Sequence, residues 1–204
     1  NTFKRLHLNL WVTQETKFIA DSAWMECNNK PIIPDELIGR ECYGGLDLSS
    51  TRDMSAFVLI FPDEDNNIDV LPFFWIPKDT AIERTRNENI NYQAWINNNQ
   101  VIATEGNVID YAFIKQTIKE CAEKFDIKKI AYDRWGATQL VIDLINDGAE
   151  MQPYGMGYRS MSAPTKELEK IVLGKTLNHG GNEVLRWQMS NVAVTQDPTG
   201  ALKP

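Results

Sequence analysis

One carboxylate in an apolar strand places the tightest limit on how this chain can fold. Asp47 stands between Leu46 and Leu48 in the segment 43–61, whose alternation and turn residues predict a β-hairpin. Side chains alternate between the two faces of a strand, so Asp47 projects to the opposite face from its apolar neighbours. A charge in such a strand persists mainly where a cation, a metal or a hydrogen-bond network compensates it. We therefore expect Asp47 to be a metal ligand.

Composition limits the class of protein. The 204 residues are enough for one sizeable core, or for one domain plus an arm, and a hydrophobic content of 43% is ordinary for a soluble globular protein. No apolar run reaches the roughly 18 residues that a membrane span needs, and the first residues do not resemble a signal peptide. We expect a cytoplasmic protein without a membrane partner.

Charge and cysteine content narrow the class further. Cys27, Cys42 and Cys121 are an odd number without C-x-x-C spacing, which favours buried thiols over disulfides or a zinc site. The formal charge of −7 argues against a general nucleic-acid coat protein, because phosphate binding draws on clustered Lys and Arg. It does not exclude a nuclease, since carboxylates that bind divalent cations make the metal-free protein acidic.

The chain divides into an N-terminal arm, residues 1–38, and a main domain, residues 39–204. Apolar positions in the arm predict a short helix around residues 21–28 that packs on the main domain, with Asp21 or Ser22 as its N-cap.

The first half of the main domain reads as strands. Three antiparallel strands are predicted, at residues 41–49, 54–61 and 68–76. Pro72 should place the third strand at an edge of the sheet, because proline cannot donate a backbone hydrogen bond. Residues 78–98 are polar and predicted to be partly helical, as a lid or a substrate-facing insertion.

The second half alternates helices with strands. Asp110 is the predicted cap of an amphipathic helix, whose apolar stripe is Ile114, Ile118, Cys121, Ala122 and Phe125. The further elements expected are a strand at 129–133, a helix at 136–147 that ends at Gly148, a strand at 150–154, and a helix from Ser162-Ala-Pro164 to Gly174. The helix at 136–147 should bury Leu140, Val141, Leu144 and Ile145. This order predicts an α/β fold in which three antiparallel strands continue into parallel βαβ crossovers, with helices on both sheet faces.

Asp133 is the second candidate ligand. It lies at the carboxyl end of a predicted parallel strand, where ligands bind in open α/β sheets, although a lone aspartate there more often caps the next helix. A right-handed crossover would bring this strand beside the first, so that Asp133 meets Asp47. Two neighbouring carboxylates repel each other unless a cation lies between them, which favours Mg²⁺ or Mn²⁺. A pair of such ions supports phosphoryl chemistry.

The other candidates have ordinary explanations beside the functional ones. Asp53 is an accessory ligand or, as we favour, a turn residue. His179 lies in a predicted flexible loop, where it positions water or contacts the scissile phosphate, or is simply exposed. Candidate DNA contacts are Arg52, Arg134, Arg159 and Lys166, each of which could equally be a solvated surface cation.

Two enzyme classes are not supported. Gly174-Lys-Thr176 is not a P-loop, because Glu169 occupies the position of the first glycine and the segment ends a helix, so ATP hydrolysis is not expected. No G-x-S-x-G elbow for a Ser-His-Asp hydrolase exists either.

Four segments of the chain form a familiar set: Arg5-Leu-His-Leu-Asn-Leu-Trp11, Gly45-Leu-Asp-Leu-Ser-Ser-Thr-Arg-Asp-Met-Ser-Ala56, Ala131-Tyr-Asp-Arg-Trp135, and His179-Gly-Gly-Asn-Glu-Val-Leu-Arg-Trp187 with Asn191. In these segments the chain resembles a known family, the nuclease half of the large terminase subunit of tailed bacteriophages and prophages. They follow the order of the family over nearly the whole chain, and the second and fourth are the specific ones.

The resemblance implies a ribonuclease H-like fold with a central sheet of five strands, and an endonuclease that cuts concatemeric double-stranded DNA with two divalent metal ions, Mg²⁺ or Mn²⁺. The aspartate matching Asp47 bridges the metals in that family, and the one matching Asp133 completes one coordination shell. Further partners implied are the terminase ATPase domain, the small terminase subunit and the portal, in the cytoplasm of a bacterial host.

The family also has a third aspartate, on a helix downstream of the final loop. The sequence ends at Gly200-Ala-Leu-Lys-Pro204, where that helix would be about to begin, and Asp197 lies in a turn rather than at the third ligand. We therefore expect a fragment without the C-terminal helix, either a truncated gene product or an excised domain. The alternatives are a catalytically inactive docking or DNA-guiding module, and another ribonuclease H-like nuclease such as a junction-cutting enzyme.

Overall fold

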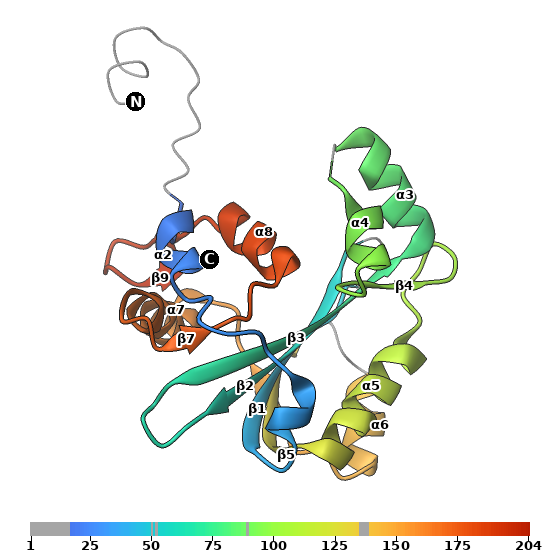
Figure 1. Ribbon diagram of the computed structural model, residues 1–204, viewed down its shortest axis with the longest axis horizontal. Helices are drawn as coiled ribbons and strands as arrows, with labels where there is room; N and C mark the ends of the chain where they lie inside the picture. Colours follow the sequence, from blue (N-terminus) through green and yellow to red (C-terminus); the bar gives the residue numbers. More distant parts are fainter. Residues whose placement is uncertain (1–16, 50, 52, 89, 135–138) are drawn as a thin grey trace, which may run out of the picture.

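The hairpin that contains Asp47 forms the centre of a mixed β-sheet (Figure 1). The computed structural model describes residues 17–49, 51, 53–88, 90–134 and 139–204. The strands that match the sequence expectation are β1 (Glu41–Asp47), β2 (Ser55–Pro62), β3 (Ile68–Pro77), β5 (Asp126–Asp133) and β6 (Met151–Tyr154). Strands β1, β2 and β3 are antiparallel neighbours, while β5 is parallel to β1 and β6 is parallel to β5. The predicted topology of an antiparallel unit continued by parallel crossovers is confirmed.

Two short strands extend the sheet from five strands to seven. They are β4 (Ile102–Thr104) and β7 (Leu177–Asn178), and both pair with β3 in parallel. Strands of two and three residues are too short for alternation to reveal them in a sequence. Because β7 pairs near Ile68 and β4 near Trp75, β3 is not an edge strand as a whole. Pro72 lies between the two pairings.

One face of the sheet carries the main core. Phe57, Leu59 and Phe61 point to this face from β2 and are completely buried. They pack with α5 (Tyr111–Lys124) and α6 (Gln139–Asn146), which cover this face (Figure 1). Gly44 of β1 is required by this packing, because a Cβ there would stand 2.9 Å from the Phe57 ring.

The opposite face is covered by helices from both ends of the chain. These are α7 (Tyr158–Leu173), α8 (Glu183–Asn191) and α2 (Asp21–Met25). Val58 of β2 and Val70 of β3 point to this side and pack in a second cluster with Val172 of α7 and Trp24 of α2. Helices therefore lie on both faces of the sheet, as the sequence predicts.

Helix α7 begins at Tyr158, one turn earlier than the predicted start at Ser162, so Pro164 lies inside the helix. A proline at this position leaves the carbonyl of the residue four positions earlier without its helical donor. That carbonyl belongs to Ser160, and the Tyr154 hydroxyl donates a hydrogen bond to it at 2.9 Å. The tyrosine at the end of β6 thus replaces the missing amide and lets the helix run through the proline.

The described part of the N-terminal arm packs on the sheet through α2 and the short 3-10 helix η1 (Pro34–Leu37). Trp24 and Cys27 of this region are buried. The predicted helix is confirmed, but its N-cap is Ala20, and Asp21 lies inside the first turn. The Asp21 carboxylate accepts two hydrogen bonds from the Arg186 guanidinium of α8, at 2.8 and 2.7 Å, so it ties the two helices together instead of capping one.

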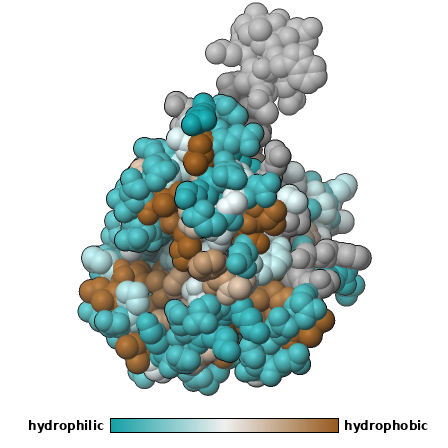
Figure 2. All heavy atoms as spheres, turned by 90° about the vertical axis from the view of Figure 1, so that its right-hand side faces the viewer, coloured by the Kyte–Doolittle hydropathy of each residue, from teal (hydrophilic) through white to brown (hydrophobic). Residues whose placement is uncertain are grey.

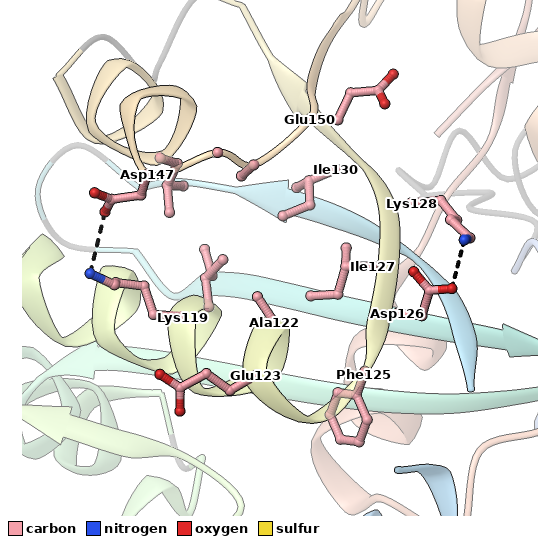
Figure 3. A pocket seen from close by; sticks show the side chains of 14 residues that line it. Lys119, Ala122, Glu123, Phe125, Asp126, Ile127, Lys128, Ile130, Asp147 and Glu150 are labelled. Carbon is pink, nitrogen blue, oxygen red and sulfur yellow. Dashed lines mark ion pairs between the residues drawn. The ribbon is translucent and has the colours of Figure 1, made fainter. Parts of the chain in front are cut away.

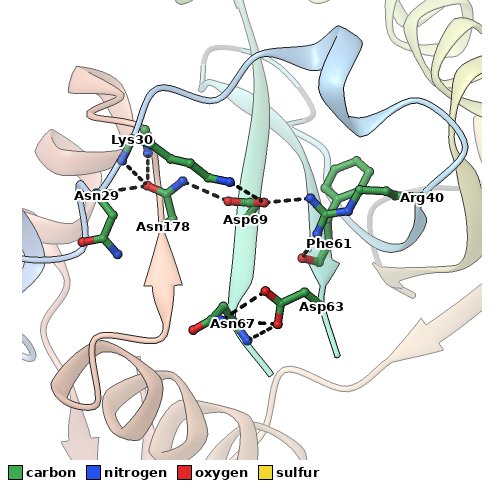
Figure 4. Close-up of polar contacts among 9 residues, drawn as sticks. Asn29, Lys30, Arg40, Phe61, Asp63, Asn67, Asp69 and Asn178 are labelled. Atoms are coloured by element: carbon green, nitrogen blue, oxygen red, sulfur yellow. Dashed lines mark hydrogen bonds and ion pairs between the residues drawn. The ribbon is translucent and has the colours of Figure 1, made fainter. Parts of the chain in front are cut away.

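A polar network fastens the arm to the sheet (Figure 4). The Asn178 amide oxygen of β7 accepts from the backbone N–H groups of Asn29 and Lys30, at 3.2 and 3.4 Å. Its amide nitrogen donates to Asp69 of β3 at 2.9 Å. The Arg40 guanidinium donates to the other Asp69 oxygen at 2.8 Å. One largely buried carboxylate of β3 is therefore linked to the arm, to Arg40 and to β7, the strand that precedes α8.

The helix ends follow the sequence closely. The Asp110 carboxylate accepts from the Ala112 N–H at 2.9 Å at the start of α5, and Gly148, with φ of 96°, follows α6. Two apolar positions depart from the predicted stripes, because Ala122 and Ile145 are exposed. The remaining elements are α3 (Lys78–Asn87) and α4 (Tyr92–Asn97), and the pair β8 (Thr195–Gln196) and β9 (Leu202–Lys203). The helical content predicted for 78–98 is confirmed, and its lid role stays a prediction.

Apolar surface is dispersed over the face that carries α3 to α6 (Figure 2). Figure 2 shows it as separate patches among polar side chains, and the exposed apolar residues include Phe113 of α5 and Ile142 of α6. None of the described helices is long and apolar enough to span a bilayer.

All three cysteines are free and buried, as expected. Burial raises the pKa of the Cys42 and Cys121 thiols to about 12. These thiols are therefore core residues.

Candidate metal centre

The two predicted aspartates lie side by side at the carboxyl ends of neighbouring parallel strands. Leu46 of β1 is in register with Tyr132 of β5, so the next position on each strand places Asp47 beside Asp133. Adjacent strands are about 4.8 Å apart. The crossover geometry thus brings together two carboxylates that are 86 positions apart in the chain.

Both aspartates line one cavity of about 510 Å³ on the sheet face covered by α7. Ala56 and Val58 of β2 form one wall of this cavity, and Met161 and Pro164 of α7 form another. Tyr154, the residue that supports α7, also lines it. The two carboxylates therefore stand in a largely apolar recess.

The electrostatics of the recess fit a divalent cation. Part of the Asp47 side chain is exposed to solvent, but the surrounding protein removes some of its hydration. This desolvation raises the pKa of the Asp47 carboxyl group. The negative charges of Asp133 and Asp53 raise the Asp47 pKa further. A cation between the carboxylates would relieve this repulsion, and carboxylate oxygens are the ligands that Mg²⁺ and Mn²⁺ prefer. Within the described ranges, no group of three or more His, Cys, Asp or Glu side chains is placed to bind a metal, which leaves this pair as a candidate donor set.

Asp53 lies near the pair and has a long-range partner. Its carboxylate accepts a hydrogen bond from the Arg84 guanidinium of α3, and its backbone N–H donates to the Ser49 hydroxyl at 2.9 Å. We favoured a turn role in which the Asp53 side chain accepts from local amides, but the local contact is made by the Asp53 backbone and the carboxylate pairs with Arg84 instead. Arg84 was missed by sequence reasoning, because nothing in a polar helix indicates which of its cations faces a loop 31 residues away.

The expectation that His179 lies in an exposed, flexible loop is wrong. Its side chain is 1% exposed and stacks on Trp24, with ring centroids 4.5 Å apart. Nδ1 accepts from the Gly181 N–H at 3.2 Å, which assigns the proton to Nε2, 2.8 Å from the Trp24 carbonyl. Burial lowers the pKa of His179, in keeping with a neutral ring.

His179 is also remote from the aspartate pair. It directly follows the β7 residue that pairs with Asp69 of β3, whereas Asp47 is level with Phe74 of the same strand. These positions on β3 are five residues apart, or about 17 Å along the strand. The structure does not bring His179 to the carboxylates.

The predicted DNA-contacting cations have different positions. Arg134 is exposed and directly follows Asp133. Arg159 and Lys166 are exposed on α7, the helix that lines the cavity. Arg52 lies outside the described residues, as does the segment 5–11 on which part of the family resemblance rests. A role of these cations in DNA contact stays a prediction.

A second cavity of about 530 Å³ lies near the other end of β5 (Figure 3). Its lining includes the apolar residue Ile130, and two of its carboxylates have lysine partners: Lys119 lies 3.6 Å from Asp147, and Lys128 lies 2.6 Å from Asp126. Since these carboxylates have lysine partners, the Asp47–Asp133 pair is the better candidate for a cation.

Comparison with known sequences identifies relatives of the whole chain. The family model described as terminase large subunit, endonuclease domain, matches residues 1–204. The large terminase subunit of Enterobacteria phage HK97 is 34% identical over 205 positions, which cover 100% of this chain and 40% of that protein. Protein YmfN of Escherichia coli (strain K12) is 28% identical over 200 positions, covering 94% of this chain and 44% of that protein. The chain thus spans less than half the length of either relative.

Solved structures agree on the fold. The crystal structure of the HK97 large terminase matches with a TM-score of 0.83 and 33% identity, over 99% of this chain and 42% of that one. The large terminase nuclease of thermophilic phage G20c with bound magnesium matches with a TM-score of 0.53 and 12% identity, over 94% of this chain and 87% of that one. At that identity the G20c likeness shows the fold alone. Together with the sequence match, these findings show that the chain belongs to the terminase large subunit endonuclease-domain family and has its ribonuclease H-like fold.

Proposed function

We propose that this chain is a metal-dependent endonuclease domain that cuts concatemeric double-stranded DNA during phage DNA packaging. The observation that carries the proposal is the Asp47–Asp133 pair, held at the carboxyl ends of adjacent parallel strands in one recess. Family membership supports the nuclease role. Metal-bound structures of the G20c nuclease, with magnesium and with cobalt, support a divalent cofactor.

Asp47 and Asp133 would hold Mg²⁺ or Mn²⁺, with two ions expected for the complete family site. Such ions, when bound, activate water and stabilise the charge that develops on the phosphodiester. The carboxylates must be ionised to bind a cation, and the raised pKa of Asp47 makes this binding weaken as pH falls. The apolar walls of the recess lower the local dielectric constant, which strengthens every charge interaction inside it.

The remaining parts of the proposal come from the family. The substrate is double-stranded DNA, and the partners are the terminase ATPase domain, the small terminase subunit and the portal. The site of action is the cytoplasm of the bacterial host, where packaging substrates are present.

A plasmid-nicking assay tests the proposed activity. Supercoiled plasmid is incubated with Mn²⁺ and with the unsubstituted chain, Asp47→Asn or Asp133→Asn. We expect each substitution to reduce nicking at least about 100-fold, because loss of a mere outer-shell partner of a metal ligand already costs about 10–100-fold in metal affinity or activity. Asp65→Asn is the matched control, because Asp65 is an exposed turn residue outside the site. Equal nicking by the unsubstituted chain and Asp47→Asn would mean that a contaminant cuts the DNA.

A DNA-guiding module without cutting activity is the second candidate, favoured by the presence of two rather than three clustered carboxylates among the described residues. Calorimetry with Mn²⁺ separates the two: two bound ions contradict the guiding module, and no bound ion supports it. A junction-cutting nuclease predicts instead that branched DNA is cut in preference to linear duplex.

A further inference from the structure

Arg84 of α3 connects an outlying helix to the loop that follows Asp47. Its guanidinium donates a hydrogen bond to Asp53, whose negative charge is close enough to raise the pKa of Asp47. The Arg84 side chain is 26% exposed, while that of Asp53 is 75% exposed. An ion pair this open to water contributes little to overall stability.

Arg84 is itself held on a rigid base. The guanidinium lies close to the Tyr92 side chain, which is 1% exposed. The Tyr92 ring packs edge-on against Trp95, with centroids 5.2 Å apart, and contacts Trp187 of α8 at 6.3 Å. The Arg84 side chain therefore extends toward Asp53 from a packed aromatic cluster. Because this cluster already restricts the Arg84 side chain, that side chain loses little further conformational freedom when it pairs with Asp53.

The β1–β2 loop has further local supports. The Ser49 N–H donates to the Ser55 hydroxyl at 2.9 Å, and the Ser49 hydroxyl accepts the Asp53 N–H at the same distance. The Tyr111 hydroxyl donates to the Ser49 carbonyl at 2.7 Å. Tyr111 supports the start of the loop from α5, and Arg84 supports Asp53 from α3. Ser49 and Asp53, both described residues of this loop, are thus held from two separate helices.

We propose that Arg84 is a positioning residue for the carboxylate centre: by pairing with Asp53 it holds the β1–β2 loop in place beside Asp47. The inference rests on the proposed nuclease function. It gives the 78–98 insertion a definite task, which is to support the loop next to the carboxylates. Arg84 acts through Asp53 and does not itself contact the reacting phosphate.

Amide hydrogen exchange tests the positioning without requiring activity or metal. In Arg84→Ala we expect the Ser49 and Asp53 amides to exchange about 2- to 5-fold faster, because loss of a partly exposed ion pair makes local opening of the loop easier. Arg86→Ala, which removes the same charge from an exposed position two residues along α3, should leave both amides unchanged. Unchanged exchange in Arg84→Ala would overturn the inference. If Arg84→Ala does not fold, Asp53→Asn, which removes the same pair from its exposed end, is measured in its place.

Kinetics of plasmid nicking distinguish positioning from direct DNA binding. We expect Arg84→Ala to lower kcat at least about 10-fold with little change in KM, and Arg84→Lys to restore part of the loss. The double variant Arg84→Ala with Asp53→Asn should be no worse than the more damaging single variant, because both act through one contact. Direct DNA binding by Arg84 would instead raise KM and leave kcat unchanged. It would also reduce the slope of log affinity against log salt concentration by about 1, the value for one phosphate contact. This result would overturn the inference.

The two proposals fail separately. If Asp47→Asn abolishes nicking while Arg84→Ala behaves like the unsubstituted chain in both assays, only the positioning role is wrong. If Asp47→Asn nicks normally, the nuclease assignment is wrong, and the exchange measurement still decides whether Arg84 orders the loop.

Discussion

The Asp47 carboxyl group is easier to protonate than a free aspartate, because desolvation in the recess and the charges of Asp133 and Asp53 all act against ionisation. A folded-state pKa above the unfolded value means that protonation favours the native state. This stabilisation is complete below the unfolded pKa of about 3.9 and is lost as pH rises through the higher folded value. At neutral pH, ionised Asp47 therefore lowers the stability of the metal-free protein.

Asp47→Asn should accordingly raise the melting temperature at pH 7 in the presence of a chelator. A gain of up to about 2–4 °C corresponds to 1 kcal/mol in a chain of this size. Mn²⁺ should stabilise the unsubstituted chain and have a much smaller effect on the variant, because a ligand raises stability only where it binds. Scanning calorimetry with and without Mn²⁺ measures both, with Asp65→Asn as control. A lower melting temperature for Asp47→Asn in chelator would contradict the electrostatic account.

Elements depend on side chains that belong to other elements, and α7 is the clearest case. Tyr154→Phe removes the hydrogen bond to the Ser160 carbonyl and should cost about 0.5–1.5 kcal/mol. In a Pro164→Ala background the helix recovers its own amide donor, so the same Tyr154→Phe change should cost clearly less. Urea unfolding of the four members of this double-mutant cycle measures the difference. Equal costs in both backgrounds would show that the tyrosine hydroxyl does not replace the missing amide.

At the scale of the whole molecule, Asp69 joins the N-terminal arm to the sheet. Burial acts to raise the pKa of Asp69, but hydrogen bonds from Asn178 and Arg40, with the charge of Lys30, outweigh it and lower the pKa. The stability gained is present above the unfolded pKa and is lost as pH falls through the lower folded value.

Asp69→Asn should therefore lower the free energy of unfolding at pH 7 by about 1–3 kcal/mol, because Arg40 loses a charged, largely buried partner. The difference from the unsubstituted chain should shrink as pH falls below about 4. Urea titrations at several pH values measure it, and a penalty that is independent of pH would show that the carboxylate charge is not what matters. Asp63→Asn is unsuitable as a control, because that carboxylate holds its own turn; Asp65→Asn serves here as well.

The sequence predicted those parts of the fold that depend on local chemistry and on general rules of chain connection. The alternation in β1 and β2, the Asp110 cap and the crossover handedness were enough to place Asp47 next to Asp133. The errors concern contacts between distant segments. His179 is buried because Trp24, 155 positions earlier, stacks on it, and no periodicity around His179 records that.

The same limit applies within the candidate site. The two carboxylates could be predicted because each lies on a strand whose position follows from topology. The partner of Asp53 could not, because Arg84 is one of several cations on a polar helix and its direction depends on the packing of Tyr92.

Pro72 has a consequence for how separate molecules meet. The described part of β3 is paired near both ends by β7 and β4, which leaves a short stretch of strand open between them. Open strand segments attract strands of other chains and so promote aggregation. Pro72, at the middle of this stretch, offers no backbone N–H to a strand from another molecule. The unpaired stretch therefore resists intermolecular pairing, while β7 and β4 still pair with β3 on either side of it.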